Sequence, residues 1–142
     1  MLFRSRRSFA KYVLWQYAMS QGGEEQELDH ELYADCQVDH ILPDEPSTFD
    51  VTTFGFPADE DYESTKHSLG NLTLLESALN GRALNRPPTE KTSHYAQSRL
   101  HSTRVLGARI TEAGFTSDAQ RKRLDELVRF FKEHWPIPRP TP

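Results

Sequence analysis

The stretch 36–43, with the sequence CQVDHILP, is the most informative part of the chain. Its short run stops at Pro43, and this length and ending are typical of a strand or another extended segment. Asp39 and His40 are neighbours within it. Because successive side chains of a strand point to opposite faces, we expect these two side chains on opposite sides of the segment.

A second informative stretch, 70–80, has the sequence GNLTLLESALN. Residues 72–75 are a second candidate strand, and a short helical segment is expected over 77–84. The stretch also carries two amide side chains nine residues apart, Asn71 and Asn80. The two stretches together predict two short strands and a short helix.

The sequence on either side of these stretches is mostly helical in pattern. The predicted helices cover residues 2–20, roughly 90–106 after an N-cap at Thr89, and 117–135, where Ser117 and Gln120 suggest a capping box. The segments predicted as irregular are 24–35 and 43–66, with a short strand at 49–54 in the second. The fold class predicted is therefore α+β with more helix than strand.

The residue types around His40 suit phosphodiester chemistry. A neutral imidazole can take a proton from water near pH 7. The Asp39 carboxylate is a hard oxygen donor suited to Mg²⁺ or Mn²⁺, and a bound divalent ion can stabilise the charge that develops on a phosphate. The amides of Asn71 and Asn80 could orient the base and complete the metal shell.

These residues resemble the HNH, or ββα-metal, nuclease motif. The longer string 67–75, HSLGNLTLL, is more specific. With the later residues Asn80, Asn85-Arg86-Pro87, Lys91 and Tyr95, it is similar to the C-terminal nuclease domain of GmrSD-type restriction enzymes, which attack modified phage DNA. The resemblance covers roughly residues 36–135 and implies a mostly helical α+β domain with an embedded ββα-metal element.

The resemblance also implies a role for each residue. His40 would be the general base that activates water, and Asn71 would hold the His40 loop through backbone hydrogen bonds. Asp39 and Asn80 would ligate one divalent metal ion, Mg²⁺ or alternatively Mn²⁺. The last position of such motifs is often His, and the amide oxygen of Asn80 is an acceptable ligand for Mg²⁺.

A basic segment follows the motif. Residues 66–109 contain seven Lys and Arg side chains and two acidic ones, so they could hold phosphates. The side chains predicted to contact DNA are Arg82, Arg86 and Lys91, and the auxiliary candidates are His67, Asn85 and Tyr95.

Several of these residues have structural alternatives. Asn71 and Asn80 each adjoin a glycine, so they also suit a turn or a helix end. Lys91 and Tyr95 are four residues apart, on one side of a helix. They either anchor that helix to the motif or touch the DNA backbone.

The charge of the chain must be considered by region. The formal net charge of −4 seems to argue against a nucleic-acid partner. However, residues 21–65 hold fourteen acidic side chains and no Lys or Arg, whereas 1–20 and 66–142 are both basic. This division is consistent with DNA binding of modest, salt-sensitive affinity.

Length and composition set the broad class. The 142 residues suit one domain over 1–142, with an N-terminal helix in 1–20, the ββα-metal core in 36–86, C-terminal helices in 89–135 and a Pro-rich tail at 136–142. No apolar run approaches the length of a membrane span. The single cysteine excludes an internal disulfide and suits a cytoplasmic protein.

The sequence thus predicts a divalent-metal-dependent DNA endonuclease domain that nicks one strand at a time, as the effector of a restriction or anti-phage defence system. The resemblance implies an N-terminal sensor domain or a partner subunit, and the chain is either excised from a longer protein or a stand-alone relative. Two alternatives stay open: a catalytically silent DNA-binding module of the same fold, and a helical protein-interaction domain.

Overall fold

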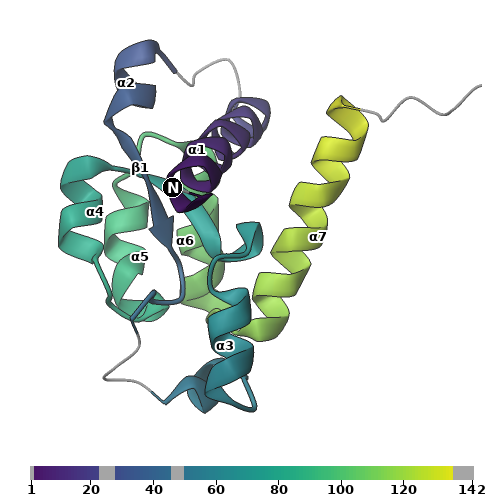
Figure 1. Cartoon of the computed structure of the whole chain (residues 1–142). Helices are drawn as coiled ribbons and strands as arrows, with labels where there is room; N and C mark the ends of the chain where they lie inside the picture. Colours follow the sequence, from purple (N-terminus) through teal and green to yellow (C-terminus); the bar gives the residue numbers. More distant parts are fainter. Residues whose placement is uncertain (1, 23–27, 46–49, 136–142) are drawn as a thin grey trace, which may run out of the picture.

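The computed structural model describes residues 2–22, 28–45 and 50–135, without the side chains of residues 2–5 (Figure 1). The tail predicted at 136–142 lies outside the described residues. The α-helices are α1 (Leu2–Gln21), α2 (His30–Asp35), α3 (Asp59–Thr65), α4 (Ser77–Ala83), α5 (Pro88–Ala96), α6 (His101–Ala113) and α7 (Ser117–His134). The 3-10 helices are η1 (Val51–Phe54) and η2 (Leu69–Asn71), and the strands are β1 (Cys36–His40) and β2 (Leu72–Glu76).

The two strands form an antiparallel sheet near the middle of the molecule (Figure 1). Cys36 lies opposite Glu76, and His40 lies opposite Leu72. Both predicted strands and the short helix after the second one are confirmed, as is the mostly helical α+β class. The antiparallel pairing of β1 with β2 brings the 36–43 and 70–80 stretches together.

Helices cover both faces of this sheet. Cys36 and Val38 pack with residues of α1 in one hydrophobic cluster, and His40 points to the same face. Gln37 and Asp39 point to the other face, where they contact side chains of α4 and α5. The period of two along β1 therefore places Asp39 and His40 on opposite faces of the sheet, as predicted.

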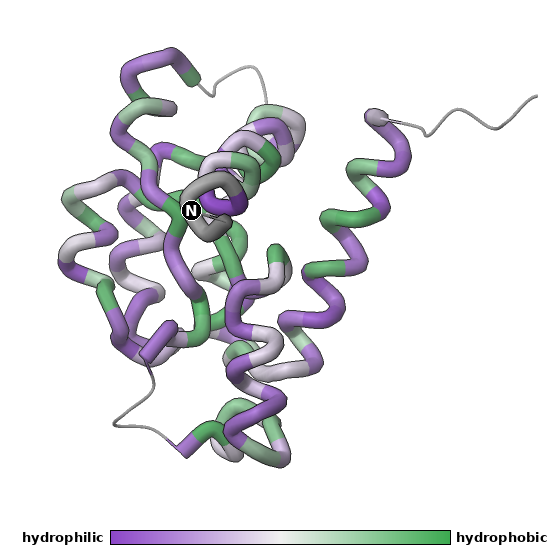
Figure 2. Tube along the Cα trace, viewed as in Figure 1, coloured by the Kyte–Doolittle hydropathy of each residue, from purple (hydrophilic) through white to green (hydrophobic). Residues whose placement is uncertain are grey.

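Helix α7 packs closely against η2, just before β2. A Cβ atom on Gly70 would lie 2.2 Å from the carbonyl oxygen of Gln120 and 2.9 Å from the Cβ of Leu124, so only glycine allows this approach. Apolar residues recur along α7 (Figure 2), and Leu127 and Phe130 are buried. This packing fixes the backbone that carries Asn71.

Two segments predicted as irregular contain helices. In the first, Asp29 caps α2 by accepting a hydrogen bond from the Leu32 N–H at 2.8 Å. In the second, Val51–Phe54 form the 3-10 helix η1, so the strand predicted at 49–54 is wrong. Helix α3 follows, and the three acidic residues of its first turn favour a helix N-terminus.

The helix predicted at 90–106 is two helices, α5 and α6. The carboxylate of Glu76 accepts hydrogen bonds from the Ser98 Oγ at 2.9 Å and from the Arg99 N–H at 2.6 Å. These bonds hold the chain in a turn between the helices. A buried side chain from β2, distant in sequence, therefore overrides the local helical pattern.

The last helix begins as predicted, but without the capping box. Thr116 is the N-cap, and the Ser117 hydroxyl instead donates to the carbonyl oxygen of Gly55 at 3.0 Å. Among the described residues, no helix combines the length and the apolar character needed to cross a membrane.

Candidate active site

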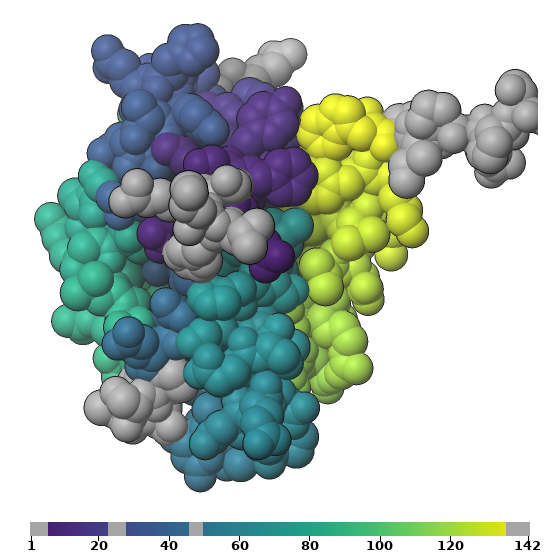
Figure 3. All heavy atoms as spheres, in the orientation of Figure 1, coloured from purple at the N-terminus to yellow at the C-terminus, as the bar shows by residue number. Residues whose placement is uncertain are grey.

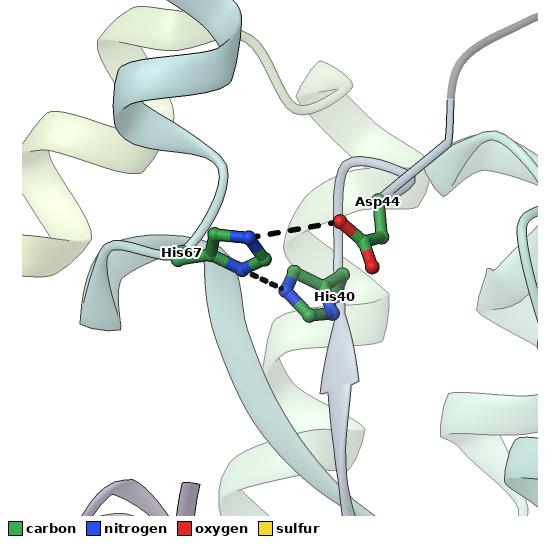
Figure 4. A group of neighbouring side chains, drawn as sticks. All are labelled: His40, Asp44 and His67. Atoms are coloured by element: carbon green, nitrogen blue, oxygen red, sulfur yellow. Dashed lines mark hydrogen bonds and ion pairs between the residues drawn. The ribbon is translucent and has the colours of Figure 1, made fainter. Parts of the chain in front are cut away.

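His40 belongs to a cluster of three side chains that includes Asp44 and His67 (Figure 4). The His40 Nε2 lies 2.9 Å from the His67 Nδ1, and the His67 Nε2 lies 3.8 Å from the Asp44 Oδ1. One ligand atom from each residue lies within 4.8 Å of the others. The cluster joins the end of β1, the turn that follows it and the turn that follows α3.

The protonation states of His40 and Asp44 suit metal binding. Burial lowers the pKa of His40 to about 4, although the Asp44 charge acts in the opposite direction, so the imidazole is neutral at pH 7. Burial acts to raise the pKa of Asp44, but Lys66 and the two histidines lower it overall. Neutral imidazoles and ionised carboxylates are the forms that ligate metal ions.

Lys66 fixes the position of Asp44. Its Nζ lies 3.1 Å from the Asp44 Oδ1 and donates to the Asp44 backbone oxygen at 2.8 Å. Lys66 is also paired with Glu63 at 2.9 Å. The carboxylate is therefore held beside His67 by a residue of the turn that also carries His67.

Asn71 holds the loop that follows His40. Its side-chain oxygen accepts a hydrogen bond from the Leu42 N–H at 2.8 Å, and its Nδ2 donates to the backbone oxygens of Leu42 at 3.1 Å and Lys66 at 2.8 Å. Asn71 is 1% exposed, and all three bonds are made to backbone. This one buried amide links the two loops that carry the cluster.

Asp39 lies on the opposite face of β1 and is 4% exposed. Its Oδ1 accepts a hydrogen bond from the Lys91 Nζ at 3.0 Å, and its Oδ2 accepts from the Tyr95 hydroxyl at 2.5 Å. The Lys91 ammonium also donates to the backbone oxygen of His40. Burial raises the pKa of Asp39, and the Lys91 charge opposes that rise.

The sequence predicts that Lys91 contacts DNA, and this arrangement contradicts that prediction. Lys91 and Tyr95 are both 0% exposed, so neither can reach a phosphate. Of the two alternatives for this pair, the structure supports anchoring: both side chains attach α5 to Asp39. The physical reason is that a buried carboxylate requires a partner in the interior.

A pocket of about 240 Å³ opens beside the cluster. His40 and His67 form one wall, and Arg6 and Arg7 of α1 form another. The remaining lining residues are Phe9, Ala10, Val38, Leu69 and Leu72. A larger hollow of about 560 Å³ lies between α6 and α7, and none of the predicted site residues lines it.

Comparison with known proteins identifies the family. The family model described as GmrSD restriction endonucleases, C-terminal domain, matches residues 2–130. The chain belongs to this family. No curated protein and no solved structure gives a significant match. The GmrSD C-terminal domain is a domain of restriction endonucleases, which act on DNA, so the chain is a nuclease-related domain.

The GmrSD domain keeps Asn80 apart from the cluster. Its Nδ2 donates to the Oε1 of Gln37 at 2.7 Å, on the Asp39 face of β1. Arg82, Asn85 and Arg86 are exposed on α4 or directly after it. Their predicted roles in binding metal or DNA remain predictions.

Three residues near His40 have no role in the sequence-based prediction. Asp44 follows Pro43 in the segment interpreted as an acidic loop, and its position just after the His40 strand is the signal that could have identified it. Arg6 and Arg7 belong to the basic N-terminal segment, within the helix predicted over 2–20. Only the packing of α1 over β1 brings them to the pocket.

Proposed function

We propose that this GmrSD C-terminal domain is a divalent-metal-dependent, HNH-type DNA endonuclease whose catalytic centre is the cluster of His40, Asp44 and His67. The observation that carries the proposal is the convergence of His40, Asp44 and His67, whose ligand atoms could hold a metal ion, beside a pocket that is lined by His40, His67 and two arginines. We further propose that it is the effector of a restriction or anti-phage system and receives its target from an N-terminal sensor domain or partner subunit.

The cluster fits a metal ion better than the predicted pair Asp39 and Asn80. Imidazole nitrogens bound to one ion at about 2.1 Å lie about 3.0 Å apart at right angles and about 3.4 Å apart at tetrahedral angles. The facing nitrogens of His40 and His67 are 2.9 Å apart in a hydrogen bond that a bound ion would replace. An ion at Asp39 would have to displace a buried ammonium from its carboxylate. We therefore assign the metal to His40, His67 and Asp44.

This donor set also bears on which metal binds. Two imidazoles and one carboxylate suit Mn²⁺ and later transition ions, whereas Mg²⁺ prefers oxygen ligands. We accordingly propose Mn²⁺ as the better activator, in place of the Mg²⁺ expected from Asp39 and Asn80.

The residues around the cluster would support strand cleavage in distinct ways. When bound, a divalent ion supplies charge stabilisation at the phosphate and a more acidic water. Asn71 would hold the loops that carry His40 and His67 together through hydrogen bonds to their backbones, and Lys66 would hold the Asp44 carboxylate close to His67. A single centre of this kind cuts one strand at a time, so nicking is the elementary event.

Supercoiled plasmid DNA provides the direct test. We expect the chain to convert it to the open circle in Mn²⁺, more slowly in Mg²⁺, and not at all in excess EDTA. Gel electrophoresis over a time course would measure the conversion. Salt-sensitive DNA binding without cleavage in either metal would favour the silent DNA-binding module, and no DNA binding would favour the protein-interaction domain.

Metal titration tests the ligand assignment separately. We expect His67→Ala to weaken Mn²⁺ binding by about 10-fold or more, because it removes one donor of the cluster. Asn80→Ala should leave the affinity unchanged, because its amide is bonded to Gln37. Isothermal calorimetry would measure both. The opposite pattern, in which Asn80→Ala weakens Mn²⁺ binding and His67→Ala does not, would indicate that the metal binds on the Asp39 face of β1.

A further inference from the structure

We infer that the pocket between α1 and the His40 cluster binds one unstacked nucleotide of a DNA strand. Arg6 and Arg7 would hold its phosphate, and Phe9 with the apolar floor of the pocket would hold its base. The inference rests on the proposed function, since it takes DNA as the substrate of the neighbouring cluster. It adds that the substrate is single-stranded or locally unpaired.

The phosphate half of the site follows from the rim of the pocket. Arg6 and Arg7 are exposed, and both line the pocket together with His40. None of the described residues that line it is acidic. Guanidinium groups suit phosphate because their planar donors match its oxygens. Figure 3 shows the surface of α1 bordering the surface of the segment that leads into β2.

The base half of the site follows from Phe9. Its side chain is 65% exposed and lines the pocket, so the ring is accessible beside the arginines. Arg6 and Phe9 are three residues apart and share one side of α1. Below them, Val38 and Leu72 give the pocket an apolar floor. An exposed ring beside arginines is the usual arrangement for binding an unstacked base.

The position of the pocket links it to the proposed chemistry. His40 and His67 are part of its wall, so a nucleotide bound there lies next to the cluster. A base inside a duplex is stacked on both sides and cannot enter such a pocket. We therefore expect tighter binding to a single strand than to a duplex of the same length.

Fluorescence anisotropy with a short labelled single-stranded oligonucleotide tests this inference. The measurement is made in EDTA, so that binding is read without cleavage. We expect Phe9→Ala to weaken binding by roughly 5- to 100-fold, as the loss of one base stack does. Arg6→Gln should weaken binding and lower the slope of log affinity against log salt by about one.

Matched controls are available on other surfaces. Tyr12 is also an exposed aromatic residue of α1, but it lines a different hollow with Trp15, so Tyr12→Ala should leave the affinity unchanged. Arg129 is exposed on α7, and Arg129→Gln controls for the loss of one charge. Thermal melts of all four variants would verify folding.

The outcomes separate the inference from the proposed function. Unchanged affinity in Phe9→Ala, or equal affinity for single strand and duplex, would overturn the nucleotide pocket even if the plasmid is cut. If the chain cuts no plasmid in any metal but Phe9→Ala still weakens oligonucleotide binding, the nucleotide pocket is supported and the proposed endonuclease activity is refuted.

Discussion

The variant His40→Ala should lose plasmid cleavage by about 100-fold or more while remaining folded. The expected loss is large because His40 contributes to the cluster and to the pocket wall together. Its imidazole is neutral at pH 7, and alanine supplies neither a ligand nor a proton acceptor. The rate of nicking in Mn²⁺, followed on gels, is the measurement.

Metal affinity of the same variant distinguishes two roles for His40. As a ligand it is required for tight Mn²⁺ binding, so His40→Ala should weaken that binding along with cleavage. As the general base implied by the family resemblance, it would be needed for cleavage only. One ring nitrogen cannot bind a metal and accept a proton at once. Normal Mn²⁺ affinity with lost cleavage would thus make His40 the base.

The control for this experiment is His30→Ala. His30 is an exposed histidine at the start of α2, outside the cluster. We expect this variant to nick plasmid at the rate of the unaltered chain. If it loses cleavage as well, the effect of His40→Ala is not specific to the centre.

Local sequence patterns were sufficient for the elements that build the site. The strand at 36–40 ends just before a proline turn, and α4 follows β2 directly, so both could be predicted from nearby residues. The alternation along β1 also predicted that Asp39 and His40 face opposite ways. Where the patterns failed, distant residues decided the structure, as when Glu76 breaks the helix predicted at 90–106.

The partners of Asp39 and His40 could not be read from the sequence. The sequence predicts Asp39 as a metal ligand but gives no sign that the Lys91 ammonium, 52 residues away in the chain, lies 3.0 Å from its carboxylate. His40 meets His67 across 27 residues. A sequence motif shows which residue types are present. Burial and long-range packing decide whether each of these side chains meets a charged partner or solvent.

The second large effect concerns stability. Lys91→Met should lower the free energy of unfolding by about 3–5 kcal/mol, because it leaves the buried Asp39 carboxylate without its cation. It also removes the donor to the backbone oxygen of His40. Urea denaturation followed by circular dichroism would measure the change. Arg109→Met, which breaks the exposed pair with Glu126, should cost at most about 1 kcal/mol.

A double-mutant cycle isolates the pairing from the loss of the side chain. Adding Asp39→Asn to Lys91→Met removes the uncompensated charge, so the double variant should be more stable than Lys91→Met alone. Recovery should be incomplete, since the His40 backbone oxygen still lacks its Lys91 donor. If Lys91→Met instead keeps full stability and loses only DNA affinity, Lys91 binds phosphate as first predicted. The Lys91 ammonium donates to both the Asp39 carboxylate and the backbone oxygen of His40. Its loss should therefore affect both Asp39 and His40, whose side chains lie on opposite faces of β1.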